Sequence, residues 1–143
     1  MAHAFSGPDR RVIHPVHAVL LASTLPLLLG ALLSDWAYSR SYQVQWTNFA
    51  SWLNAGALIF AGAALLWAVL DFFRADVARG RVGALYLLVL LTTFVLGLIN
   101  ALVHAKDAGA AMPAGLILSL LVFLLALASV WLGFSRHRGS GAR

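Results

Sequence analysis

The sequence predicts an all-α integral membrane protein with four transmembrane helices in an antiparallel bundle. Four segments of about twenty residues carry almost no charge: residues 16–33, 53–70, 82–103 and 113–134. At a rise of 1.5 Å per residue, each segment is long enough to cross a hydrocarbon core about 30 Å thick as a helix. Short connections between consecutive segments make neighbouring helices antiparallel.

The basic residues around these segments predict the orientation in the membrane. Two of the ten, Arg40 and Lys106, lie in the first and last connections. The other eight lie before the first segment, between the second and third, or after the fourth: Arg10, Arg11, Arg74, Arg79, Arg81, Arg136, Arg138 and Arg143. Positive residues in short loops favour the cytoplasmic side, so both termini and the middle loop are expected in the cytoplasm.

Composition agrees with this class of protein. A mean hydropathy of +0.87 and a charged fraction of 10% describe a lipid-facing chain rather than a soluble one. The net charge of +5 is explained by the cytoplasmic clustering, so nucleic-acid binding is not expected. The absence of cysteine excludes disulfides, thiolate metal sites and cysteine nucleophiles.

One membrane domain accounts for most of the chain. We expect a polar cytoplasmic tail over residues 1–13, a transmembrane domain over 14–134 and a basic cytoplasmic tail over 135–143. The helices are expected at about 15–35, 49–73, 82–105 and 113–134. The aromatic connection 36–51 is expected to lie along the outer interface, where amphipathic rings prefer the headgroup level.

The second helix is rich in small residues, which allow a neighbouring backbone to approach closely. This pattern places the second helix at the centre of the bundle or at a contact with another copy. The residues expected at this packing surface are Gly56, Ala57, Ala61 and Gly62.

Ionisable residues are costly inside a bilayer, so they mark candidate sites. At the inner face, His14 and His17 begin the first helix and Asp71 ends the second. Two imidazoles and a carboxylate could bind a divalent metal such as zinc or ferrous iron. The alternative is that Asp71 pairs with Arg74 while the histidines lie among the headgroups.

A second polar cluster is predicted at the outer face. Asn100, His104 and Asp107 follow i, i+4, i+7 spacing on one stripe of the third helix, while Asp35 ends the first helix and Asn54 begins the second. Hydrogen bonds among these groups could tie three helix ends together. Alternatively, a histidine between two carboxylates could sense pH or bind metal.

Several functions conflict with this distribution. His14 and His17 lie a membrane thickness away from His104, so they cannot share one haem with it. The chain has no Glu, which excludes a carboxylate di-metal bundle. No catalytic triad converges at one depth, so enzymatic activity is not supported. Proton-coupled transport normally uses a midplane ionisable group, whereas the midplane offers hydroxyls only: Ser23, Thr24, Thr92, Thr93 and Ser119.

Several of these residues resemble a known family. The opening 13–17 (Ile-His-Pro-Val-His), Pro26, Asp35, Asp71 and the stretches 100–104 and 131–134 are similar to the small bacterial membrane proteins grouped as domain of unknown function 2231. The resemblance covers residues 13–136 and implies a bacterial inner membrane, with no established activity. Two features differ: Ala18 stands where relatives often have proline, and Leu25 where they often have histidine. The missing histidine weakens a metal or haem site at the inner face.

We therefore expect a non-enzymatic multi-pass bundle in the bacterial inner membrane. Its partners would be the lipid bilayer and either a second copy of the chain or a larger membrane assembly, contacted through the second helix. The alternative is a small haem- or metal-binding redox protein that uses the histidines at the helix ends.

Overall fold

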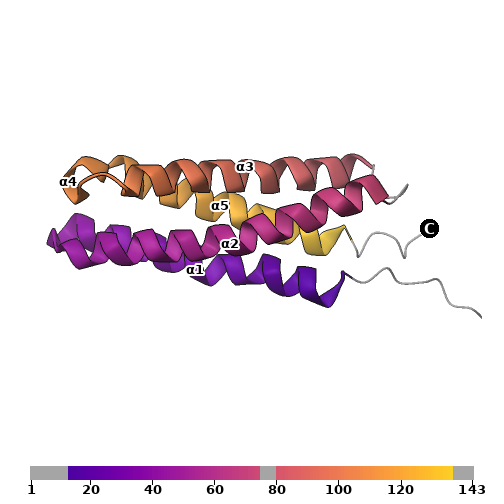
Figure 1. The fold of residues 1–143 in the computed structure, drawn as a ribbon, viewed down its shortest axis with the longest axis horizontal. Helices are drawn as coiled ribbons and strands as arrows, with labels where there is room; N and C mark the ends of the chain where they lie inside the picture. Colours follow the sequence, from indigo (N-terminus) through magenta and orange to yellow (C-terminus); the bar gives the residue numbers. More distant parts are fainter. Residues whose placement is uncertain (1–12, 75–79, 137–143) are drawn as a thin grey trace, which may run out of the picture.

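The computed structural model describes residues 13–74 and 80–136. Four long helices lie side by side along one axis (Figure 1), and the described residues contain no strand. The long helices are α1 Pro15–Ser41, α2 Val44–Arg74, α3 Arg81–His104 and α5 Ala114–Ser135. A short helix, α4 Ala108–Ala111, lies between α3 and α5. All four long helices are long and apolar enough to cross a membrane. The prediction of an all-helical membrane protein with four spans is confirmed.

Each long helix packs against two antiparallel neighbours. α1 contacts α2 and α5, and α3 also contacts α2 and α5, so the chain runs up and down around a four-membered ring. The bundle therefore has two distinct ends. At the α4 end, α1 turns into α2 and α3 leads through α4 into α5; at the Pro15 end, α1 begins and α5 ends.

Buried residues on each long helix recur at alternating spacings of three and four. This heptad pattern has a period of 3.5 residues and is typical of helices packed as a left-handed supercoil. On α2 and α3 the buried residues are Thr47, Ala50, Asn54, Ala57, Ala61, Ala64 and Ala68, and Gly83, Tyr86, Leu90, Thr93, Gly97, Asn100 and His104.

The side chains inside the bundle are on the whole smaller and more polar than those on its outer surface. Ala57 and Ala61 are buried in the core face of α2, and the large apolar side chains of the same helix, such as Trp52, Ile59 and Leu66, are exposed. Large apolar side chains directed outward suit a hydrocarbon solvent, and small residues inside allow close helix packing.

The two glycines predicted at the packing surface of α2 contact its neighbours within the bundle. A Cβ atom on Gly62 would lie 3.1 Å from Phe94 of α3, whereas one on Gly56 would lie 3.7 Å from Leu27 of α1. The lack of a side chain at Gly62 therefore allows Phe94 to lie close to the α2 backbone, whereas a side chain at Gly56 would make only ordinary contact.

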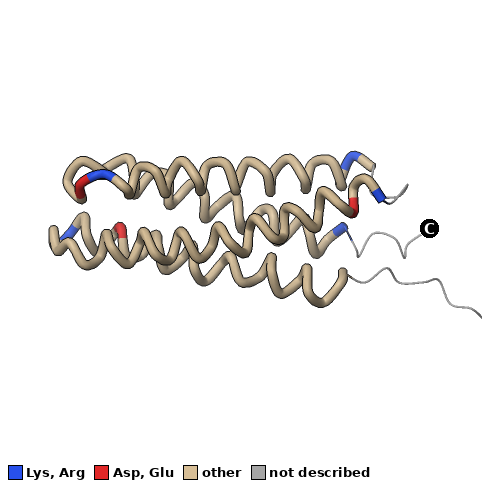
Figure 2. The backbone as a smooth tube through the Cα atoms, viewed as in Figure 1, with Lys and Arg blue, Asp and Glu red and all other residues tan. Residues whose placement is uncertain are grey.

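Charged residues of the described chain lie near the two ends of the bundle (Figure 2). On the third span, residues 82–105 separate Arg81 from Lys106 and contain no charged residue other than the titratable His104. Those 24 residues extend about 36 Å as a helix, which matches the thickness of a hydrocarbon core with a short margin.

The first connection is shorter than expected. α1 continues to Ser41 and α2 already begins at Val44, so most of the predicted interfacial loop 36–51 is helical. Asp35, where the first helix was expected to end, lies inside α1, because an aspartate does not by itself break a helix. α1 ends where Tyr42 takes a left-handed conformation with φ of 55°. Most of the expected tails, 1–13 and 135–143, lies outside the described residues, although α5 runs through Ser135.

Candidate functional site

A buried contact between two ionisable side chains joins α1 to α3 near the α4 end. His104 Nε2 lies 2.7 Å from Asp35 Oδ1. The Asp35 side chain is fully buried and the His104 side chain is 1% exposed. Two ionisable groups are thus held in direct contact with almost no access to solvent.

Ser119 and Asn100 extend this contact to α5. The Ser119 hydroxyl donates to Asp35 Oδ2 over 2.5 Å, and Asn100 Nδ2 donates to the Ser119 oxygen over 2.9 Å. On the other side, His104 Nδ1 lies 2.9 Å from the Asn100 carbonyl oxygen. Asp35, His104, Ser119 and Asn100 form a continuous network across three helices, called the Asp35 network below.

The chemistry of these atoms fixes the proton on His104 Nδ1 and the net charge of the pair. A backbone carbonyl only accepts, so His104 Nδ1 carries a hydrogen and donates to Asn100. Nε2 therefore faces the carboxylate either with a lone pair or with a second hydrogen. A hydrogen bond between Nε2 and Oδ1 needs one proton between these two atoms, bound either to the imidazole or to the carboxyl group. The pair then has no net charge, which is the state that a low-dielectric bilayer favours.

Close packing holds the imidazole in this position. A Cβ atom on Gly115 of α5 would lie 3.0 Å from His104 Cε1. The absence of a side chain at residue 115 allows the ring to lie against the α5 backbone. Ser119 follows one helical turn later and faces the same side of α5, because residues four apart are neighbours on a helix surface.

The remaining residues of the predicted outer cluster lie outside this network. Asn54 Nδ2 donates to the Gly97 carbonyl oxygen over 3.1 Å and so joins α2 to α3. Asp107 is exposed and precedes α4, where its side chain makes no capping hydrogen bond. Of the five predicted residues, the structure brings together Asp35, Asn100 and His104, places Asn54 against Gly97 of α3, and leaves Asp107 exposed.

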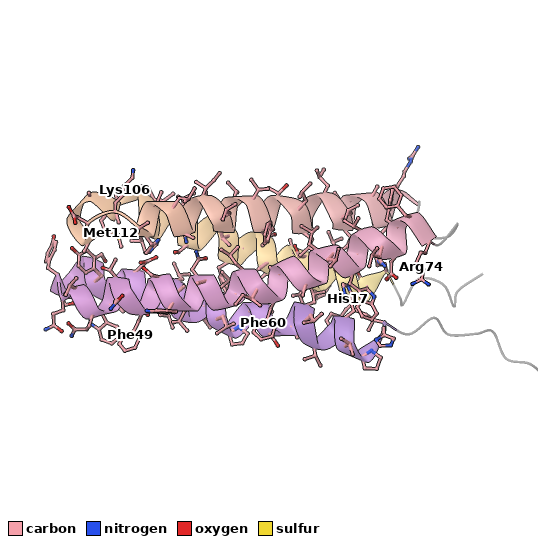
Figure 3. The ribbon with its side chains drawn as sticks, in the orientation of Figure 1. His17, Phe49, Phe60, Arg74, Lys106 and Met112 are labelled. Carbon is pink, nitrogen blue, oxygen red and sulfur yellow. The ribbon has the colours of Figure 1, made fainter. Side chains whose placement is uncertain are left out.

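A second polar contact lies at the Pro15 end, where Figure 3 labels His17 and Arg74. His17 Nε2 lies 2.8 Å from the Tyr86 hydroxyl, joining α1 to α3. The guanidinium of Arg136 lies 4.7 Å from the centre of the Tyr86 ring, a cation–π contact. The rings of His14 and His17 lie 4.8 Å and 6.0 Å from Trp67 of α2.

These contacts bear on the predicted metal ligands. Within residues 13–74 and 80–136, no three His or Asp side chains are grouped so that they could hold a metal ion. His17 points to Tyr86, His14 Nδ1 accepts from the Val16 amide, and Asp71 lies half-buried on α2. The structure does not bring His14, His17 and Asp71 together, so metal or haem binding there stays a prediction.

Sequence reasoning misses three contributors, namely Ser119, Gly115 and Tyr86. The sequence groups Ser119 with the midplane hydroxyls, although it lies only six residues into the expected fourth helix. Its i, i+4 relation to Gly115 is an available signal, because both lie on the buried stripe of α5. Tyr86 has the pattern of an interfacial aromatic, yet it is 1% exposed.

A family match covers all of these features. The family described as "Predicted membrane protein (DUF2231)" matches residues 13–137, which include all four long helices and both polar contacts. The chain belongs to this family. The description of DUF2231 names the membrane and no activity, so the role of this member has to be argued from its own residues. No curated protein and no solved structure matches the chain.

Proposed function

We propose that this DUF2231 protein is a non-enzymatic membrane bundle that acts through association with a second copy or with a larger membrane assembly. The observation that carries the non-enzymatic part of the proposal is the Asp35 network. Its ionisable and hydroxyl groups bond one another across α1, α3 and α5. Groups used in this way tie helices together and are buried from any substrate.

The exposed face of α2 is the surface that we propose for association. Four large apolar side chains on this face recur at intervals of seven residues and are between 60% and 75% exposed: Trp52, Ile59, Leu66 and Phe73. A repeat of seven keeps side chains on one line of a helix that packs against a partner. Gly56 and Gly62 face Leu27 of α1 and Phe94 of α3 within the chain, so the large side chains of this line carry the proposed surface.

Cysteine crosslinking tests this proposal directly. The chain has no cysteine, so each single variant carries one thiol. We expect Ile59→Cys to form a disulfide-linked dimer in native membranes under mild oxidation. Leu124→Cys on α5 and Leu88→Cys on α3 are matched controls, because both positions are also exposed and apolar. Equal crosslinking at all three positions would indicate random collision and would refute association through α2.

We also propose that the protein lies in the bacterial inner membrane with the Pro15 end facing the cytoplasm. The support is the excess of Lys and Arg in the termini and the middle connection. Arg74 and Lys106 are exposed at opposite ends of the bundle, as Figure 3 shows. In intact spheroplasts, an impermeant thiol reagent should label Lys106→Cys and spare Arg74→Cys. The reverse labelling pattern would overturn the orientation.

A further inference from the structure

Three buried side-chain oxygens in the described residues have no hydrogen-bond partner: Thr47 Oγ1, Asn54 Oδ1 and Asn100 Oδ1. All three belong to the half of the bundle nearer α4. Asn54 is fully buried and Asn100 is 1% exposed. An amide oxygen buried without a donor is destabilising, and in native proteins ordered water commonly supplies the missing donor.

The orientation of both amide groups follows from their partners. Asn54 must direct Nδ2 to the Gly97 carbonyl, because a flipped amide would place two acceptors face to face. The single hydroxyl hydrogen of Ser119 goes to Asp35, so Ser119 can only accept from Asn100 Nδ2. Both Oδ1 atoms are therefore free acceptors, whatever the ambiguity between amide oxygen and nitrogen.

The two amides contact α3 within one helical turn of each other. Gly97, which binds Asn54, and Asn100 are three residues apart on α3, about 4.5 Å along the helix axis. The two amides thus lie at neighbouring levels of the bundle, and one water molecule that donates two hydrogen bonds of about 2.8 Å can bridge two acceptors about 4.5 Å apart. A divalent cation would need about six oxygen ligands, whereas these two amides supply two.

We propose that one ordered water molecule bridges Asn54 Oδ1 and Asn100 Oδ1 inside the bundle. The water joins α2 to the Asp35 network, which otherwise connects only α1, α3 and α5. It adds a link through side chains to the direct hydrogen bond by which Asn54 already joins α2 to the Gly97 carbonyl of α3.

Water-edited solid-state NMR on the full chain in lipid bilayers tests the proposal. Magnetisation from water should reach the side-chain amides of Asn54 and Asn100 at short mixing times. Thr93 and Ser129 provide the matched control, because their buried hydroxyls lie 3.1 Å apart, each also within bonding distance of a carbonyl of its own helix. Rapid transfer to both asparagines and slow transfer to the control pair supports the bridge. Slow transfer to either asparagine overturns it.

A double-mutant cycle gives a second readout. If one water joins the two amides, Asn54→Ala and Asn100→Ala each remove the same bridge, and their effects on the unfolding equilibrium should depart from additivity by about threefold or more. Asn54→Ala combined with Tyr86→Phe, at the opposite end, should be additive. Additivity in both pairs would contradict the bridge.

Discussion

Replacing Asp35 by asparagine or by alanine separates a structural role of the Asp35 network from a role of its proton. In the Asp35→Asn variant, the new amide would donate to a neutral His104 Nε2 and accept from Ser119, so both bonds survive without net charge. The Asp35→Ala variant loses both bonds and leaves His104 Nε2 and Ser119 without this partner. Asparagine has nearly the same shape as aspartate, so the first variant changes the charge and keeps the packing.

The expected magnitude follows from burial. Two side-chain hydrogen bonds in a bilayer contribute about 0.6 kcal/mol each on average, which sets a lower bound near ~1 kcal/mol for Asp35→Ala. Removing one partner of a buried ion pair costs about 3–5 kcal/mol in soluble proteins. Because Asp35 is fully buried, we expect a loss of about 3 kcal/mol for Asp35→Ala, and less than about 1 kcal/mol for Asp35→Asn.

Reversible unfolding in mixed micelles, followed by tryptophan fluorescence, measures both free energies. Asp107→Asn is the matched control, because Asp107 is exposed and should tolerate the change with no effect. If Asp35→Asn destabilised the protein as much as Asp35→Ala, the network would need the carboxylate itself, and the expectation that a neutral amide can replace it would be refuted. If Asp35→Ala were neutral, the network would not hold the helices together.

Three further predictions concern the core. Gly133→Ala should lower the free energy of unfolding by about 1–3 kcal/mol, because its Cβ would lie 2.6 Å from buried Leu21; Gly109→Ala, with open space around it, should be neutral in the same assay. Tyr86→Phe should cost about 1 kcal/mol by removing the bond to His17, and a loss equal to that of the exposed Tyr42→Phe would contradict this reasoning. Ser129→Ala should cost less than about 1 kcal/mol, since Thr93 keeps the Val89 carbonyl, and a larger loss would show that the Thr93–Ser129 contact matters more than its geometry suggests.

The fold was predictable because membrane insertion imposes a strong pattern on the chain. Uncharged segments of the right length located all four spans, and short connections set their antiparallel order. The bounds of α1 and α2 were less accurate because hydropathy detects the membrane boundary, and a helix need not end there. α1 continues past Asp35 to Ser41 since its polar residues are compatible with a helix.

The candidate site was predictable in part for a related reason. Depth along each helix can be counted from the sequence, which places Asp35, Asn100 and His104 at one level, where the structure brings them into one network. The prediction for Asp107 assumed that the i, i+4, i+7 stripe continues along α3. α3 ends at His104, so the helical periodicity does not extend to Asp107. The contact of Asp35 with Ser119 depends on which helices are neighbours in the ring, and single-helix patterns do not give that arrangement.

An ionisable residue inside a membrane is commonly taken as a sign of function, because it needs a partner. In this bundle the requirement is met internally: both carboxylate oxygens of Asp35 and both ring nitrogens of His104 have partners within the chain. The charge of Asp35 therefore gives little reason to expect a ligand. The uncharged amides carry more information, because Asn54 and Asn100 each have an acceptor that no side chain satisfies. A polar molecule that enters this end of the bundle should bind these two oxygens before it disturbs the Asp35–His104 pair.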